Sequence, residues 1–228
     1  MSEETMAEQH TLTLLMSEFV TRDVKRFVLS RPPEFTFQPG QGVELAINRP
    51  GWTDKGRPFT PTGLADDRVL EFTIKCYPEH EGVTRELHRL SPGAGLLSSA
   101  PFGTIRDQGP GVFIAGGAGI TPFLAILRER ARTAELEGNT LLFSNKTRAD
   151  IICEKELRHS LGERCILTCT AEQAPGYAHR RIDKAFLTEQ IENFDQHFYV
   201  CGPPGFMEAV NGALQELGVD PQSLVFER

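Results

Sequence analysis

The stretch Gly111-Val112-Phe113-Ile114-Ala115-Gly116-Gly117-Ala118-Gly119-Ile120-Thr121-Pro122-Phe123 decides how this chain folds. Its apolar run Val112–Ala115 is typical of a buried strand, and three glycines within four residues follow that run. Thr121 suits the N-cap of a following helix, and Pro122 suits the first helical position, where a missing N–H costs no hydrogen bond. A glycine-rich turn that leads into a helix N-terminus brings bare backbone N–H groups close to an anion. We therefore predict that this turn binds the pyrophosphate of a dinucleotide.

The same stretch departs from the usual dinucleotide fingerprint. In G-x-G-x-x-G a third glycine stands where this chain has Pro122. Taken alone, the stretch is equally compatible with a tight strand-to-helix turn that binds nothing. The remainder of the sequence has to decide between the two readings.

Composition limits the classes of protein to consider. The 228 residues suffice for one large domain or two of roughly 110 residues each. The net charge of −7 argues against nucleic acid as a partner, and no apolar run approaches the roughly 18 to 20 residues of a membrane span. Five cysteines without a C-x-x-C pair indicate reduced thiols, and the acidic start of the chain lacks the layout of a secretory signal. We expect a cytoplasmic protein that binds no metal.

Basic side chains nevertheless gather in two places along the sequence. For both groups we expect a solvated face rather than a binding site. The first group is Arg22, Lys25, Arg26 and Arg31, and the second, after the glycine turn, is Arg128, Arg130 and Arg132.

The first hundred residues have the pattern of an antiparallel sheet. Residues 69–75 alternate strictly between apolar and polar side chains, which is typical of a strand with one buried face. Further strands are expected at 11–16, 24–29 and 42–47, and a helix at 83–90. Turn signals separate these segments, as in Pro39-Gly40 and Pro92-Gly93. Several short strands with regular turns predict a small antiparallel β-barrel.

From Gly111 onward, short apolar strands alternate with helices, which predicts a parallel sheet covered on both faces. Its ligand crevice should lie at the carboxyl ends of the strands. We therefore expect two domains, a β-barrel over residues 1–106 and an α/β domain over residues 107–228. The expected strands of the second domain are 112–115, 140–143, 165–168 and 198–201, and its expected helices are 122–135, 150–161, 184–191 and 206–217.

Four motifs in this order resemble those of the ferredoxin–NADP reductase family of flavoproteins, and the resemblance covers nearly the whole chain. That family also has proline in place of the third glycine, which favours the nucleotide reading of the glycine turn. The motifs are Arg57-Pro58-Phe59-Thr60, Gly82-Val83-Thr84-x-x-Leu87, Gly116-Gly117-Ala118-Gly119-Ile120-Thr121-Pro122 and Tyr199-Val200-Cys201-Gly202-Pro203-Pro204-Gly205-Phe206-Met207.

The resemblance implies a flavin bound to the barrel. In the first motif Arg57 would hold the flavin phosphate, Phe59 would stack on the flavin, and Thr60 would reach toward flavin N5. Phe59 replaces the tyrosine of the family, which keeps the stacking but loses the phenol hydroxyl. The turn at Gly82, Val83 and Thr84 implies a pyrophosphate, and therefore FAD rather than FMN. Further contacts are expected from Pro58, Ile74, Lys75, Tyr77 and the C-terminal Phe226, with Glu227 as a proton source.

The resemblance also implies a pyridine nucleotide on the second domain, with Cys201 near the nicotinamide. The loop 144–150 bears on the choice between NADH and NADPH. Lys146 or Arg148 can pair with a 2′-phosphate, whereas Asp150 would repel one, and we favour NADH. The expected nucleotide contacts are Gly116, Gly117, Gly119, Ile120, Thr121, Pro122, Asn145, Cys201, Gly202 and Pro203.

The implied activity is that of a flavoenzyme that accepts a hydride from NADH or NADPH on flavin N5 and passes electrons to a separate acceptor. Thr60, Cys201 and Glu227 are its candidate catalytic residues. The acceptor would be flavodoxin, a ferredoxin or a small molecule. An acidic partner protein would dock on the basic residues Arg22, Lys25 and Arg26. Two alternatives remain open: a reductase that uses free flavin as its substrate, and a non-catalytic flavin-binding regulatory subunit.

Overall fold

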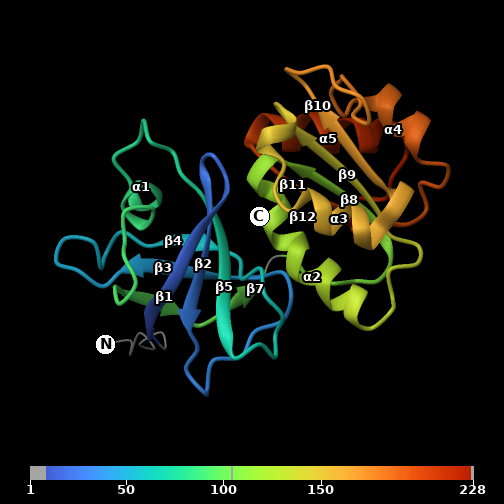
Figure 1. The fold of residues 1–228 in the computed structure, drawn as a ribbon. Coiled ribbons are helices and arrows are strands. Elements are labelled where there is room, and N and C mark those ends of the chain that lie inside the picture. Colours follow the sequence, from blue (N-terminus) through green and yellow to red (C-terminus); the bar gives the residue numbers. More distant parts are fainter. Residues whose placement is uncertain (1–8, 104, 227–228) are drawn as a thin grey trace, which may run out of the picture.

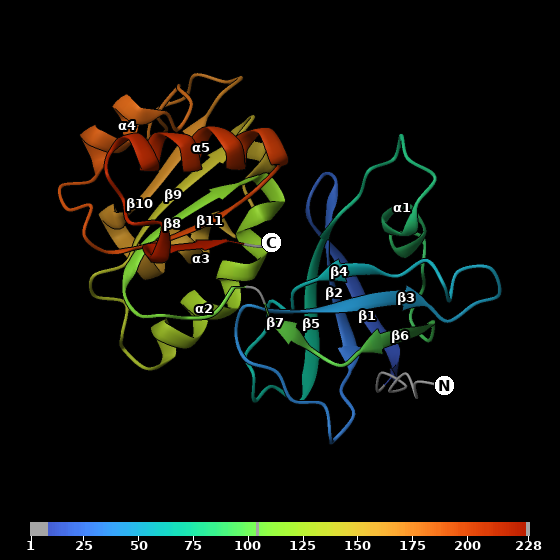
Figure 2. The same cartoon turned by 180° about the vertical axis from the view of Figure 1, so that it is seen from behind.

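Two sheets of opposite construction organise the computed structural model, which describes residues 9–103 and 105–226 (Figures 1 and 2). The first sheet is antiparallel and follows the order β4-β3-β6-β1-β2-β5, with β7 also paired to β3. Its strands are β1 (Gln9–Thr21), β2 (Val24–Ser30), β3 (Gln41–Ile47), β4 (Arg57–Phe59), β5 (Val69–Lys75), β6 (Gly95–Ser99) and β7 (Phe102–Gly103), and α1 (Val83–Leu87) lies between β5 and β6.

The antiparallel sheet closes on itself as a barrel. The chain leaves β4 and reaches the far edge strand β5, where Pro61 forms a bridge with Phe72 and the Thr62 N–H donates to the Glu71 carbonyl at 2.7 Å. The apolar side chains of β5 point into the barrel, because Leu70, Phe72 and Ile74 are all buried. The alternation over residues 69–75 therefore predicted both this strand and its inner face.

The second sheet is wholly parallel, in the order β10-β9-β8-β11-β12. Helices α2 and α3 pack on one face of it, with Phe123 and Leu157 in that core, and helices α4 and α5 pack on the other, with Phe186 and Leu214. Its elements are β8 (Gly111–Gly116), α2 (Thr121–Arg132), β9 (Thr140–Asn145), α3 (Glu154–Leu161), β10 (Cys165–Cys169), α4 (Lys184–Gln190), β11 (His197–Cys201), α5 (Pro204–Glu216) and β12 (Leu224–Phe226).

This architecture confirms the predicted fold class, an antiparallel barrel followed by a parallel-sheet α/β domain. No helix of the described residues combines the length and the apolar character needed to cross a bilayer.

Local details of the helix starts differ from the predictions. A 3₁₀ turn over Gly117–Ile120 precedes α2, so Ile120 rather than Thr121 is the N-cap. The Thr121 hydroxyl instead donates to the Ala118 carbonyl at 3.0 Å. The helix expected at 150–161 begins only at Glu154, because Cys153 has a left-handed backbone with φ of 53°.

Of the basic residues of α2, Arg132 is exposed as expected, but Arg128 and Arg130 do not belong to the solvated face that we expected. Arg130 is only 4% exposed and binds Asp107 and Asn139. Nearby, the Tyr199 hydroxyl donates to the Gly109 carbonyl and accepts from the Gln108 N–H, both at 2.8 Å. These bonds fasten the segment between the two sheets to the α/β domain.

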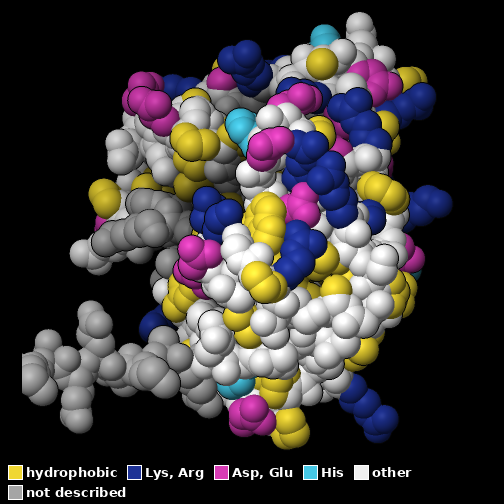
Figure 3. Space-filling view, turned by 90° about the vertical axis from the view of Figure 1, so that its left-hand side faces the viewer, with side chains coloured by type: hydrophobic (Ala, Val, Ile, Leu, Met, Phe, Trp, Pro, Cys, Tyr) yellow, Lys and Arg dark blue, Asp and Glu magenta, His cyan; other side chains and the backbone are white. Residues whose placement is uncertain are grey.

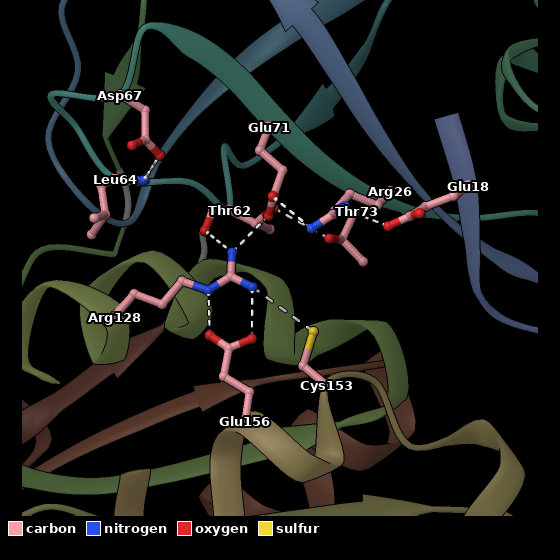
Figure 4. A network of polar contacts seen from close by, with 10 residues as sticks. All are labelled: Glu18, Arg26, Thr62, Leu64, Asp67, Glu71, Thr73, Arg128, Cys153 and Glu156. Carbon is pink, nitrogen blue, oxygen red and sulfur yellow. Dashed lines mark hydrogen bonds and ion pairs between the residues drawn. The ribbon is translucent and has the colours of Figure 1, made fainter. Parts of the chain in front are cut away.

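Arg128 instead joins the two domains, because α2 lies on the side of the α/β domain that faces the barrel (Figures 1 and 2). Its guanidinium donates to the Thr62 carbonyl and to Glu71 Oε1 of the barrel, both at 2.6 Å (Figure 4). The same group makes two bonds with Glu156 of α3, at 2.6 and 2.9 Å. One half-buried cation thus binds carboxylates from both domains. This role of Arg128 does not show in the periodicity of the helix, because Thr62 and Glu71 of the barrel are distant from Arg128 in sequence.

Candidate functional site

A cleft of about 750 Å³ lies between the two domains. One wall consists of the loops that follow the carboxyl ends of the parallel strands β8 and β9, together with Pro203 and Phe206 near the end of β11. The other wall is the barrel segment 75–80, which follows β5, and the turn between β1 and β2. The carboxyl edge of a parallel sheet is where ligands bind in such folds. The cleft is therefore the candidate site.

The glycine loop after β8 forms the floor of this cleft, with Gly116, Gly117 and Ala118 among the lining residues. Gly117 has a φ of +54°, a left-handed conformation that favours glycine, and a Cβ there would meet nothing within 4 Å. At Gly119 a Cβ would lie 2.3 Å from the Cys201 carbonyl oxygen. The loops after β8 and β11 thus touch through backbone alone, as the predicted pyrophosphate turn requires.

Asn145, at the end of β9, also lines the cleft. It is only 5% exposed, and among the described residues neither atom of its carboxamide finds a hydrogen-bond partner. A buried amide without a partner costs free energy. The orphaned carboxamide therefore indicates a place for a polar ligand group, such as a ribose hydroxyl.

Asp150 occupies the adjoining wall and forms a capping box with Thr147, whose N–H and hydroxyl donate to Oδ2 at 3.0 and 2.7 Å. The guanidinium of Arg22, which comes from the barrel, lies 3.1 Å from Asp150 Oδ1. Burial alone raises the pKa of Asp150, but the Thr147 hydrogen bonds and the Arg22 charge outweigh burial and hold this pKa below its ordinary value. Asp150 is thus a carboxylate in the cleft at neutral pH.

Apart from the C-terminal Phe226, the predicted flavin-contact residues lie on the barrel, and the cleft lining includes only Lys75 and Tyr77 of them. Arg57 is exposed on β4, where its Nη1 donates to the neighbouring Gly56 carbonyl at 2.8 Å. Phe59 and Thr60 are half-buried at the end of the same strand.

The second flavin motif lies beside β3. Gly82 is the N-cap of α1, and a Cβ there would meet nothing within 4 Å. Arg49, which follows β3, holds α1 in place through an ion pair with Glu86 at 2.9 Å. Thr84 is half-buried in the first turn of α1.

Several predicted contact residues turn their side chains into the protein cores. Ile74 and Val83 belong to the barrel core and Ile120 to the α/β core, so only their backbone can face a ligand. The Ile74 carbonyl is already bonded to His88 Nε2 at 2.8 Å. Pro122 is buried in the first turn of α2.

The last predicted residues lie at or near the carboxyl ends of β11 and β12. Cys201 ends β11 and is 8% exposed, Gly202 is half-buried, and Pro203 is exposed at the cleft. The backbone of Phe226 ends β12 and pairs in register with Val200. The side chain of Phe226 and all of Glu227 lie outside what the structure describes.

Sequence reasoning missed part of the cleft lining. Those residues come from turns and from the segment after β5, where no periodicity or motif marks a ligand contact. The missed lining residues include Asp23, Cys76, Glu79, His80 and Thr170, together with Arg22 in its role at Asp150.

The basic residues expected to meet an acidic partner have partners within the chain. Lys25 Nζ donates to the His88 carbonyl at 2.8 Å, and Arg26 pairs with Glu18 at 2.5 Å and with Glu71 at 3.6 Å. On the barrel side of the molecule, lysine and arginine side chains gather in the upper half of the face and are interspersed with acidic ones (Figure 3). This surface is mixed in charge rather than uniformly basic.

Comparisons with known proteins agree with this geometry. Residues 113–212 match the oxidoreductase NAD-binding domain family. The chain is 25% identical, over 93% of its length, to the naphthalene 1,2-dioxygenase system ferredoxin–NAD(P)+ reductase component of Pseudomonas putida, and it spans 66% of that protein.

Solved structures share the arrangement of both domains. The CS-b5R domains of human Ncb5or in the NAD+ form superpose with a TM-score of 0.84 at 28% identity, over 99% of this chain and 71% of that one. A ferredoxin NADP+ reductase from Neisseria gonorrhoeae with bound FAD and NADP gives 0.82 at 19% identity, over 97% and 98% of the two chains. In its motifs, in both sheets and in the oxidoreductase NAD-binding domain matched at residues 113–212, the chain is thus similar to the ferredoxin–NADP reductase-like flavoproteins.

Proposed function

We propose that this chain is an NAD(P)H-dependent flavoprotein reductase, which oxidises NADH, reduces a bound FAD and delivers electrons to a separate acceptor. One observation carries the proposal: the glycine loop at the carboxyl edge of the parallel sheet faces the barrel segment 75–80 across a single cleft. A nucleotide on the sheet and a flavin on the barrel would meet there. The flavin would supply the hydride-accepting chemistry, and the protein would supply binding and orientation.

The residues of the barrel fit a flavin dinucleotide. Arg57 donates one hydrogen bond, from Nη1 to the carbonyl of its neighbour Gly56, and its other guanidinium donors could bind a phosphate. Phe59 offers a half-exposed ring, and the open space at Gly82 would let a second phosphate approach the first turn of α1, although the Gly82 N–H itself already donates to the His80 carbonyl at 2.8 Å. FAD is bound in the structure from Neisseria gonorrhoeae, which has the same fold. Thr60, at the end of β4, would place a hydroxyl near the flavin ring.

The α/β domain fits a pyridine nucleotide. Gly117 and Gly119 bring backbone close to a pyrophosphate, and the Asn145 carboxamide is free to bond a ribose hydroxyl. Cys201 ends β11 and Gly202 follows it beside this loop, where the nicotinamide would lie. We infer a preference for NADH, because the Asp150 carboxylate repels a 2′-phosphate and accepts hydrogen bonds from a ribose diol. The human neighbour of known structure binds NAD+.

We infer that the acceptor is a protein of the ferredoxin type. The support is the bacterial relative, whose name describes the ferredoxin reductase component of a dioxygenase system. Small iron–sulfur proteins are electron carriers suited to such a transfer. Because Lys25 and Arg26 have partners within the chain, docking would depend on shape and on mixed charge more than on one basic patch.

The decisive experiment is anaerobic mixing of the flavin-loaded protein with NADH, and separately with NADPH, while the flavin absorbance is followed. We expect rapid bleaching by NADH and slower bleaching by NADPH. Bleaching only when free flavin is added in excess would favour the reductase of dissociable flavin. No bleaching by either nucleotide would contradict the reductase proposal and favour a non-catalytic flavin-binding subunit.

A further inference from the structure

We propose that Arg22, a residue of the barrel domain, sets how strongly the site discriminates between the two pyridine nucleotides. It does so by offsetting the charge of Asp150 across the interdomain cleft. The inference rests on the proposed function, since it concerns the adenosine ribose of the same nucleotide. It adds a selectivity residue that the nucleotide-binding domain does not itself contain.

The two oxygens of Asp150 have different partners. Oδ2 accepts both hydrogen bonds of the capping box from Thr147, so it is committed to the fold of the loop. Oδ1 is buried and accepts no hydrogen bond from any described residue. Its nearby charge is the Arg22 guanidinium at 3.1 Å. Oδ1 is therefore the oxygen left for a ligand, and Arg22 is the group that a ligand meets beside it.

Arg22 can respond to a ligand because its side chain is 69% exposed and stands in the two-residue turn between β1 and β2. The carboxylate next to it in sequence is already occupied, since Asp23 pairs with Lys75 at 3.1 Å and contacts the Thr21 hydroxyl. Within the described part of the chain, Asp150 is the acidic partner of Arg22. The exposed Lys146 lines the same wall of the cleft. The charges of Arg22 and Lys75 both act on Asp150, and because Lys75 is paired with Asp23, Arg22 and Lys146 are the cations of this cleft left to meet a ligand anion.

This balance predicts how each nucleotide is received. A 2′-phosphate carries between one and two negative charges near neutral pH, and Asp150 alone would repel it. Arg22 can rotate from the carboxylate to the phosphate and, with Lys146, make charge-assisted hydrogen bonds to it. A ribose diol, in contrast, gains little from Arg22, because it can bond directly to Oδ1. Arg22 therefore narrows the preference for NADH that Asp150 imposes.

The test compares the dissociation constants of 5′-ADP and 2′,5′-ADP for the full chain by isothermal titration calorimetry, so that no turnover is needed. We expect Arg22→Ala to raise the dissociation constant of 2′,5′-ADP about threefold to tenfold and to change that of 5′-ADP by less than about twofold. This loss of 2′,5′-ADP affinity should shrink as the ionic strength rises, because salt screens the attraction between the exposed Arg22 guanidinium and the 2′-phosphate. Arg68→Ala is the matched control, since it removes the same charge from an exposed position outside the cleft.

A second variant separates charge balance from local damage. In the double variant Arg22→Ala with Asp150→Asn, 2′,5′-ADP affinity should recover toward that of the parent, because the repelling carboxylate is gone. Equal changes for the two ligands in Arg22→Ala, or no change in either, would overturn the role of Arg22 while leaving nucleotide binding intact. Failure of the unsubstituted chain to bind both ligands would instead overturn the proposed function, and this inference with it.

Discussion

At the scale of single residues, Asn145 is the residue that we propose binds the nucleotide at the expense of stability. Its buried carboxamide has no hydrogen-bond partner among the described residues, so replacing it with the similarly sized, apolar leucine removes an unfavourable burial. We expect Asn145→Leu to keep or raise the midpoint of thermal unfolding while weakening NAD+ binding by about tenfold. Thermal denaturation and NAD+ titration of the same preparation measure both effects.

Asn139 provides the matched control for this substitution. It is fully buried, but its carboxamide bonds Arg130 and the carbonyls of Glu135 and Glu137. Asn139→Leu should therefore lose about 1 to 3 kcal/mol of unfolding free energy and leave NAD+ affinity nearly unchanged. Similar destabilisation by the two substitutions would contradict the assignment of Asn145 to a ligand.

Single residues were predictable from the sequence where a motif fixed the backbone. Gly117 and Gly119 were singled out by the glycine-rich turn and its resemblance to a family motif, and the structure gives each a conformational or steric reason to be glycine. Arg22 was considered only as part of a basic cluster, because its partner Asp150 is distant in sequence and belongs to the other domain. Contacts across a domain interface leave no local pattern in either segment.

At the scale of elements, helix α2 joins the two domains through Arg128. Replacing Arg128 with methionine keeps much of the apolar stem but leaves Glu71 and Glu156 without their shared cation. We expect Arg128→Met to lower the unfolding free energy by about 2 to 4 kcal/mol, less than for a fully buried pair because Glu156 is partly exposed. Urea denaturation measures this loss. Arg132→Met on the same helix, which breaks the exposed pairs of Arg132 with Asp66 of the barrel and with Glu129, should cost little, and an equal cost would argue against a special role for Arg128.

The same contact makes stability depend on pH. The hydrogen bonds and charge of Arg128 hold the pKa of Glu156 below its ordinary value of 4.5, despite burial. Because the folded-state pKa is lowered, the contribution is complete above about pH 5 and is lost as the pH falls through the folded-state pKa. We expect the unfolding free energy of the parent to fall more steeply between about pH 5 and pH 3 than that of Arg128→Met. Parallel slopes in urea denaturation at a series of pH values would rule out this linkage.

Elements were predictable where periodicity or an apolar run was uninterrupted. The strand at 69–75 has the predicted bounds, and strands β8, β9, β10 and β11 of the parallel sheet were found to within two residues. Strands β4, β6, β7 and β12 were missed, since none of them is longer than five residues and a period cannot emerge over so short a run. Helix α3 begins four residues later than predicted, because the left-handed Cys153 interrupts a pattern that amphipathicity alone would continue.

At the scale of the whole molecule, a nucleotide that binds in the cleft between the domains should raise the free energy of unfolding of the folded chain. A ligand that binds only the folded chain stabilises it by about 2.7 kcal/mol when its concentration is a hundred times its dissociation constant. For a chain of this size we expect NAD+ at that ratio to raise the midpoint of thermal unfolding by about 5 to 10 °C. Differential scanning calorimetry of the flavin-loaded protein measures the shift.

Gly119→Ala is the control for this experiment. Its Cβ would lie 2.3 Å from the Cys201 carbonyl, so the loops after β8 and β11 would have to separate and the pyrophosphate turn would be distorted. The shift caused by NAD+ should largely disappear in this variant. A shift of full size there would place the nucleotide away from the glycine loop.

Strand β1 begins far from the cleft turn, whereas strand β12 ends close to the ligand edge, so spectroscopic labels at the two strands would report different things. The backbone of Phe226 pairs with Val200, one residue before the end of β11, so a fluorophore attached after β12 would sit near the ligand edge and respond to occupancy. Gln9 begins a strand of 13 residues whose other end, Thr21, adjoins the cleft turn. A dye attached before Gln9 would therefore stand up to about 40 Å from that turn and act as an undisturbed reference. Energy transfer between the two dyes would report changes in the distance between the domains in solution.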